Sequence, residues 1–149
     1  MTPSERAVNN FYSGMNCAQS VFTAFAVDQG ISEADALRIS AAMGGGMGGL
    51  REKCGAVTGM FMAASLLWGN YDPTDSAAKK AFYAKIARLN YAFEDQFDTT
   101  ICRELLEKAD CEAKAQPSER TDAYYKKRPC AKFVEGAAKI LEKALEDKI

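Results

Sequence analysis

The sequence predicts an all-α fold, organised as a single domain over residues 1–149 and built as an irregular bundle of about seven helices. Helix start and stop signals recur along the chain, whereas the alternation of apolar and polar residues that marks strands does not. Several segments carry apolar side chains at every third or fourth position. The 149 residues can bury one core but are too few for two ordinary domains.

Three helices are expected in the first third of the chain, because each begins with a side chain that caps helices. Thr2, Asn16 and Ser32 can each accept a hydrogen bond at a helix start. Glu5 and Gln19 stand three residues after the first two caps and complete capping boxes. The expected helices run to about 12, from 17 to about 29 and from 32 to about 43.

A glycine-rich segment separates these helices from a fourth. Residues 44–49 read Gly-Gly-Gly-Met-Gly-Gly, which predicts a loop with little conformational restraint. The fourth helix is expected to start near Cys54 and to end at Gly69. Residues 54–71 carry no charge and reach the length of a transmembrane helix. Glycine and polar residues dilute this stretch, so we expect a buried core helix and no stable membrane insertion.

The second half of the chain is expected to wrap around the first, because it carries 28 of the charged side chains against 11 in residues 1–75. An apolar stripe predicts a helix over 75–97, and Thr99 and Thr100 are expected to cap a short helix over 101–109. Residues 112–128 are polar and predict mostly loop, and Pro129 begins a final helix to about 147. The stripe consists of Phe82, Ile86, Leu89, Phe93 and Phe97.

Composition excludes several classes of function. The chain has no histidine, which excludes Ser-His-Asp and Cys-His catalysis and histidine-ligated zinc or haem. A net charge of -1 argues against a broad surface for nucleic acid, so we expect no nucleic-acid partner. The first residues lack the apolar region of a signal peptide. A cytoplasmic location follows as the expectation, and thiols stay mostly reduced there.

Cysteines are the remaining candidates for chemistry. Four of the five lie in the first turn of an expected helix, and each of these four begins the apolar face of its helix. These four are Cys17, Cys54, Cys102 and Cys130. The N–H groups and dipole at a helix start stabilise the thiolate, which is both nucleophile and metal ligand, whereas burial favours the neutral thiol. Sequence alone leaves open which effect is larger. Cys111 lies in a polar stretch and is expected to face solvent.

The glycine-rich segment has two interpretations. Its glycines match the spacing of a dinucleotide-binding loop, but the residues before it are expected to form a helix and not a strand, which argues against that site. Together with Arg51, Lys53 and the start of the Cys54 helix, the segment can form an anion pocket or give a partner access to Cys54. Alternatively, the glycines only allow close packing.

The order of the cysteines resembles the small bacterial and archaeal family named C_GCAxxG_C_C. The resemblance spans roughly residues 5–145 and implies a redox-active protein whose functional thiols are the four cysteines at helix starts. Family genes often lie near transporter genes, which implies a functional link to a transporter. Cys111 lies outside the family pattern. The motifs that carry the resemblance are the glycine-rich segment, Asn16-Cys17-Ala18-Gln19-Ser20-Val21, Cys54-Gly55-Ala56-Val57-Thr58-Gly59, Cys102-Arg103-Glu104-Leu105-Leu106 and Cys130.

The leading hypothesis is a thiol-based redox protein with an unknown redox partner, and it leaves open whether the protein is an enzyme. Cys54 would be the reactive thiolate, because it lies near a helix start beside the flexible glycine-rich segment. Cys17 would resolve it, and Cys102 and Cys130 would form a second pair. Alternatively, all four thiolates bind an iron–sulfur cluster or zinc for electron transfer. A third hypothesis is a helical interaction module with structural cysteines. The apolar first half and the glycine-rich segment are also compatible with a homodimer.

Overall fold

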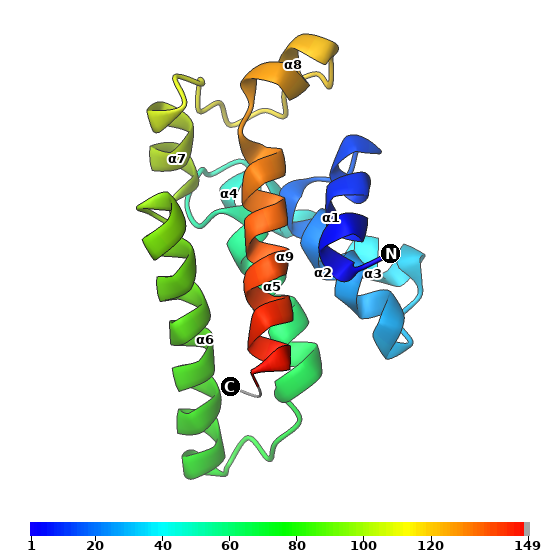
Figure 1. The fold of residues 1–149 in the computed structure, drawn as a ribbon, viewed down its shortest axis with the longest axis vertical. Helices are drawn as coiled ribbons and strands as arrows, with labels where there is room; N and C mark the ends of the chain where they lie inside the picture. The colour runs from blue at the N-terminus through cyan, green and yellow to red at the C-terminus, as the bar shows by residue number, and fades with distance from the viewer. Residues whose placement is uncertain (148–149) are drawn as a thin grey trace.

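The computed structural model describes residues 1–147, and it confirms the all-α fold (Figure 1). Within these residues β structure is limited to one antiparallel bridge between Lys53 and Ile101. Short 3₁₀ turns follow the second and third helices, at Val27–Gln29 and Ala41–Met43. The helices are α1 (Pro3–Tyr12), α2 (Cys17–Ala26), α3 (Glu33–Ser40), α4 (Gly44–Met47), α5 (Gly55–Trp68), α6 (Ser76–Phe97), α7 (Cys102–Lys108), α8 (Asp122–Lys127) and α9 (Cys130–Glu146).

The expected caps begin the first three helices. The side chains of Thr2 and Asn16 each accept a hydrogen bond from the backbone N–H three residues on, and both form complete capping boxes. Ser32 caps α3 in the same way through Asp35 N–H. Neither Thr99 nor Thr100 is the cap of α7, because Ile101 occupies that position. The hydroxyl of Thr99 instead accepts a hydrogen bond from the N–H of Ile101.

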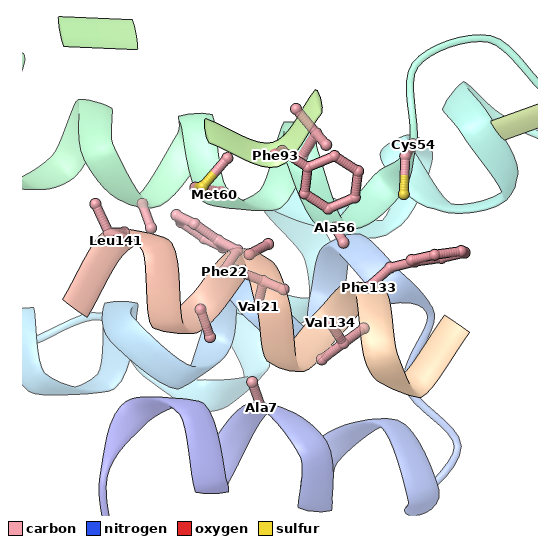
Figure 2. Close-up of a cluster of buried hydrophobic side chains, with 14 of the residues drawn as sticks. Ala7, Val21, Phe22, Cys54, Ala56, Met60, Phe93, Phe133, Val134 and Leu141 are labelled. Atoms are coloured by element: carbon pink, nitrogen blue, oxygen red, sulfur yellow. The ribbon is translucent and has the colours of Figure 1, made fainter. Parts of the chain in front are cut away.

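The core lies where α2 packs against α1, α5 and α9, and α6 lies along the outer side of α5 and α9 (Figure 1). Figure 2 shows side chains from these helices meeting in one cluster, with Met60 and Leu141 at one end and Cys54 and Phe133 at the other. Val21, Met60 and Leu141 are each fully buried. The cysteine region is therefore continuous with one end of the hydrophobic core.

Two glycines of α5 let this helix approach α2 closely. A Cβ atom on Gly55 would lie 3.1 Å from the Cβ of Cys17, and one on Gly59 would lie 2.7 Å from the carbonyl oxygen of Ala18. Both positions face the same neighbour, since residues four apart share one face of a helix. The Cys-Gly-Ala-x-x-Gly element is thus a packing motif that sets the position of Cys54 relative to Cys17.

The segment 112–128 contains a helix that the sequence analysis assigned to a loop. The helix α8 begins at Thr121, whose hydroxyl accepts a hydrogen bond from the N–H of Tyr124. The guanidinium of Arg120 lies over the ring of Tyr124, with 4.9 Å between its central carbon and the ring centroid. The helix has only six residues, too few for helix periodicity to be recognised. Tertiary contacts of Arg120 and Tyr125 with the ring of Phe11 in α1 stabilise it.

Cys111 is buried, and its expected exposure to solvent is wrong. The residue is 8% exposed, and its backbone N–H donates to the carbonyl of Leu106 at the end of α7. Its Sγ lies 3.7 Å from the carbonyl oxygen of Lys127 at the end of α8. The polar neighbours in the sequence point outward, while the chain turns back so that Cys111 packs between two short helices.

The uncharged stretch that begins at Cys54 forms the core helix α5, as expected. Ala56, Val57, Met60 and Ala63 on this helix are all fully buried. Over the described part of the chain, no helix combines the length and the apolar character that crossing a membrane requires.

Candidate functional site

The four cysteines lie at helix starts, as the sequence predicts. Cys17, Cys102 and Cys130 are the first residues of α2, α7 and α9, and Cys54 is the N-cap of α5. All four line one cavity of about 360 Å³ at the end of the bundle where α9 begins. The fold therefore brings together thiols that are spread over most of the sequence.

A short backbone pairing joins the start of α5 to the start of α7. The N–H of Cys54 donates to the carbonyl of Thr100 at 2.7 Å, and the N–H of Cys102 donates to the carbonyl of Glu52 at 2.6 Å. These bonds flank the bridge between Lys53 and Ile101. They satisfy N–H groups that a helix start leaves without a partner in the helix, and they place Cys54 and Cys102 on neighbouring chain segments.

The glycine-rich segment forms a wall of the cavity and has little freedom. Five consecutive residues, 45–49, have positive φ angles, and the segment folds back so that Arg51 N–H donates to Gly45 carbonyl at 3.1 Å. A Cβ on Gly46 would lie 2.7 Å from both the Cα of Arg51 and the Cβ of Cys102. The segment is thus a fixed element that brings Arg51 to the cysteines, where the sequence predicted a loosely restrained loop.

Cys17 and Cys130 interact directly in the site, because a hydrogen bond between their side chains shifts the pKa of each thiol. That bond, followed by burial, raises the pKa of Cys17 well above its usual value. The same bond, followed by the positive charge of Arg128 and then of Arg120, lowers the pKa of Cys130 to about 7 against the opposing effect of burial. These effects favour the thiolate on Cys130 and the neutral thiol on Cys17.

Cys54 and Cys102 are held as neutral thiols. Burial, and then the charge of Cys130, raises the pKa of Cys54 to about 12 despite hydrogen bonds from backbone N–H groups of α5. Burial also raises the pKa of Cys102, although Arg51 opposes this with a hydrogen bond from its Nη1 to Sγ at 3.6 Å. The sequence analysis favoured Cys54 as the reactive thiolate, but at this position the effect of burial exceeds the effect of the helix start.

Three arginines line the cavity together with the cysteines: Arg51, Arg120 and Arg128. Sequence reasoning named only Arg51, as part of a possible anion pocket. The other two flank α8, in the segment 112–128 that the sequence analysis predicted to be mostly loop. Lys53, also named for that pocket, lies elsewhere, with its ammonium bonded to Asn90 and 3.0 Å from the hydroxyl of Thr100. Cys111 is not among the residues that line the cavity.

The metal hypothesis required the four thiolates to converge on one ion. Among residues 1–147, no three cysteine, aspartate or glutamate side chains are arranged so that they could hold one metal ion. The structure instead arranges the thiols as a hydrogen-bonded pair with two further thiols along the cavity wall.

Comparison with models of protein families found a family that matches this chain. A family model described as "Putative redox-active protein (C_GCAxxG_C_C)" matches residues 15–144, a range that includes every residue of the thiol site. The chain belongs to this family. Searches of curated proteins and of solved structures returned no match. Membership of the C_GCAxxG_C_C family agrees with the site, because all four cysteines in the family's order line its cavity.

Proposed function

We propose that the protein is a dithiol redox protein whose working pair is Cys130 and Cys17. The observation that carries the proposal is the hydrogen-bonded contact of these two thiols beside Arg128 and Arg120, which favours the thiolate of Cys130. A thiolate is the attacking species in thiol–disulfide exchange, and a pKa near the ambient pH is best suited to that attack. The family description supports a redox role and leaves its chemistry open.

The proposed reaction transfers two electrons from the dithiol to a disulfide. The Cys130 thiolate attacks one sulfur of the disulfide, so that a mixed disulfide forms and one thiolate leaves. Cys17 gives its proton to that leaving thiolate and attacks the Sγ of Cys130. A bond forms between Cys17 and Cys130, and the second substrate thiolate leaves. The substrate disulfide is reduced to one thiol and one thiolate, which takes up a proton from water, and the protein is oxidised to one disulfide.

This assignment changes the roles that the sequence analysis gave to the cysteines. Cys17 remains the resolving residue, but its partner is Cys130 and not Cys54. Cys54 and Cys102 stay protonated and form the wall of the cavity next to the pair.

Alkylation with neutral iodoacetamide, followed residue by residue with mass spectrometry over a pH series, tests the proposal. Cys130 should react first, with a rate that rises through a midpoint near pH 7, because the titrating thiolate is held by Cys17, Arg128 and Arg120. Cys54 should react slowest in the folded protein, because its pKa is raised to about 12. Unfolded protein is the control, and in it iodoacetamide should modify all five cysteines at similar rates.

A second measurement identifies the pair directly. After the reduced protein reacts with a disulfide, peptide mapping should recover a Cys17–Cys130 disulfide, and a Cys17→Ser variant should instead trap the mixed disulfide on Cys130. The proposal is wrong if Cys130 titrates like an ordinary exposed thiol, or if another pair forms first. Inertness of all the cysteines in the folded protein would favour structural roles for them.

A further inference from the structure

The cavity carries positive charge that no acidic side chain of the described residues compensates. Three guanidinium groups and no carboxylate line it. None of the ion pairs found in residues 1–147 includes Arg51, Arg120 or Arg128. Arg51 is only 8% exposed, so its charge is largely removed from water. The thiolate of Cys130 beside Arg128 and Arg120 balances only one of these three positive charges. Buried charge that remains without a counter-charge is costly, which points to an anion as the natural partner.

Neutral groups fix the three arginines in place. Nε of Arg51 donates to the carbonyl of Lys114 at 2.6 Å, and Nη2 of Arg120 donates to the carbonyl of Met15 at 3.1 Å. Nη2 of Arg128 donates to the hydroxyl of Ser118 at 3.0 Å. These bonds orient the guanidinium groups without neutralising them, and guanidinium is the side chain that best matches a carboxylate.

The size and depth of the site favour a small molecule over a protein. A cavity of about 360 Å³ is at the lower end of the range of small-molecule sites. Cys130 is 8% exposed and is the first residue of α9, and the glycine-rich segment and Pro117 line the same cavity. A disulfide on a folded protein would have to enter this space to reach its sulfur.

We propose that the substrate of the Cys130–Cys17 pair is a small disulfide that carries carboxylates, and that Arg128, with Arg51 and Arg120, binds those carboxylates. This inference rests on the proposed function and names its substrate class. The reaction is the exchange described above: the small disulfide gains two electrons and becomes two carboxylate-bearing thiols, while Cys130 and Cys17 become a disulfide.

Three small disulfides of similar size and different charge test the proposal on the unmodified protein. Dithiodiglycolate carries two carboxylates, hydroxyethyl disulfide is neutral and cystamine carries two ammonium groups. Each rate of Cys17–Cys130 disulfide formation is divided by the rate of the same reagent with a free thiol, which removes intrinsic reactivity. The anionic reagent should exceed the neutral one by about tenfold or more, since a charge-assisted hydrogen bond has that magnitude, and cystamine should be slowest.

The variant Arg128→Gln tests the residue, and Arg38→Gln is the control because it removes an equal charge from an exposed position outside the cavity. Loss of Arg128 slows every reagent by raising the pKa of Cys130, so the decisive quantity is the ratio of anionic to neutral rates. That ratio should fall several-fold in Arg128→Gln and stay unchanged in Arg38→Gln.

Equal normalised rates for the three reagents would overturn the substrate class while leaving the dithiol function intact, provided that the Cys17–Cys130 disulfide still forms. Absence of that disulfide with every reagent would overturn the proposed function itself. The comparison of reagents needs no variant, so it remains decisive even if Arg128→Gln does not fold.

Discussion

At the residue scale, Cys130 and Cys54 both lie at helix starts and yet have opposite pKa shifts. Cys130 lies beside Cys17, Arg128 and Arg120, whereas burial dominates at Cys54. Sequence spacing predicts the helix start but not the neighbours that come from distant segments. The position of the four cysteines at helix starts was therefore predictable, whereas their proximity to one another and to Arg120 and Arg128 was not.

Gly46 and Gly48 offer a matched test of the glycine-rich wall, since both have positive φ angles but only Gly46 lacks space for a side chain. Gly48→Ala should lower the free energy of unfolding by about 1–2 kcal/mol, the cost of a left-handed backbone for alanine. Gly46→Ala should lower it by at least about 3 kcal/mol, because its Cβ would also overlap with backbone. Urea unfolding measures both values, and similar losses would contradict the close approach of Gly46 to Arg51.

At the element scale, local signals predicted helices well where a cap and an apolar face coincide. Thr2, Asn16 and Ser32 begin α1, α2 and α3 as expected. The same reasoning missed α8, which has six residues and depends on stacking of aromatic rings with Arg120. It also misjudged Cys111, because a polar neighbourhood in sequence does not show where the chain turns back.

The contact between α5 and α2 depends on Gly59, which has no room for a methyl group against the carbonyl of Ala18. Gly59→Ala should lower the free energy of unfolding by about 2 kcal/mol, although alanine is the better helix former by about 1 kcal/mol. Ser65→Ala, at an exposed position of the same helix, should change stability by less than about 0.5 kcal/mol. Stabilisation by Gly59→Ala in thermal unfolding would show that the helices are not in close contact.

At the scale of the whole molecule, α2, α5, α7 and α9 converge on one end of the bundle and carry their cysteines with them. The sequence predicted the class of fold and the apolar first half, because these follow from periodicity and composition. The expectation that the second half only wraps around the first is wrong for α9, which packs in the core against α1, α2 and α5. The sequence could not predict the convergence either, because it depends on how the helices cross. The close approach of Gly55 and Gly59 to α2 is one determinant of that crossing.

The buried thiols make the stability of the whole fold sensitive to alkaline pH. Cys54 keeps its proton in the folded state up to about pH 12, whereas an unfolded thiol loses it near about pH 8.5. The contribution of this thiol to the free energy of unfolding is thus complete below its pKa in the unfolded chain. It is lost as the pH rises toward its pKa in the folded protein. When the pH rises from about 8 to about 10, the free energy of unfolding should fall for both proteins. The fall should be about 1–2 kcal/mol smaller for Cys54→Ala than for the unmodified protein. Parallel pH profiles in urea unfolding would contradict the raised pKa.

The positions of Cys17 near the beginning and Cys130 near the end of the chain have a thermodynamic consequence. A bond between them would close most of the polypeptide into a ring, which lowers the entropy of the unfolded chain by an amount worth on the order of 4–5 kcal/mol. Linkage is reciprocal. The free energy by which the disulfide stabilises the folded protein against the unfolded chain therefore equals the free energy by which folding stabilises the disulfide against the two thiols. Such a bond would make the bundle act on its own reduction potential. A mutation that destabilises the oxidised fold more than the reduced fold would then make the pair a stronger oxidant.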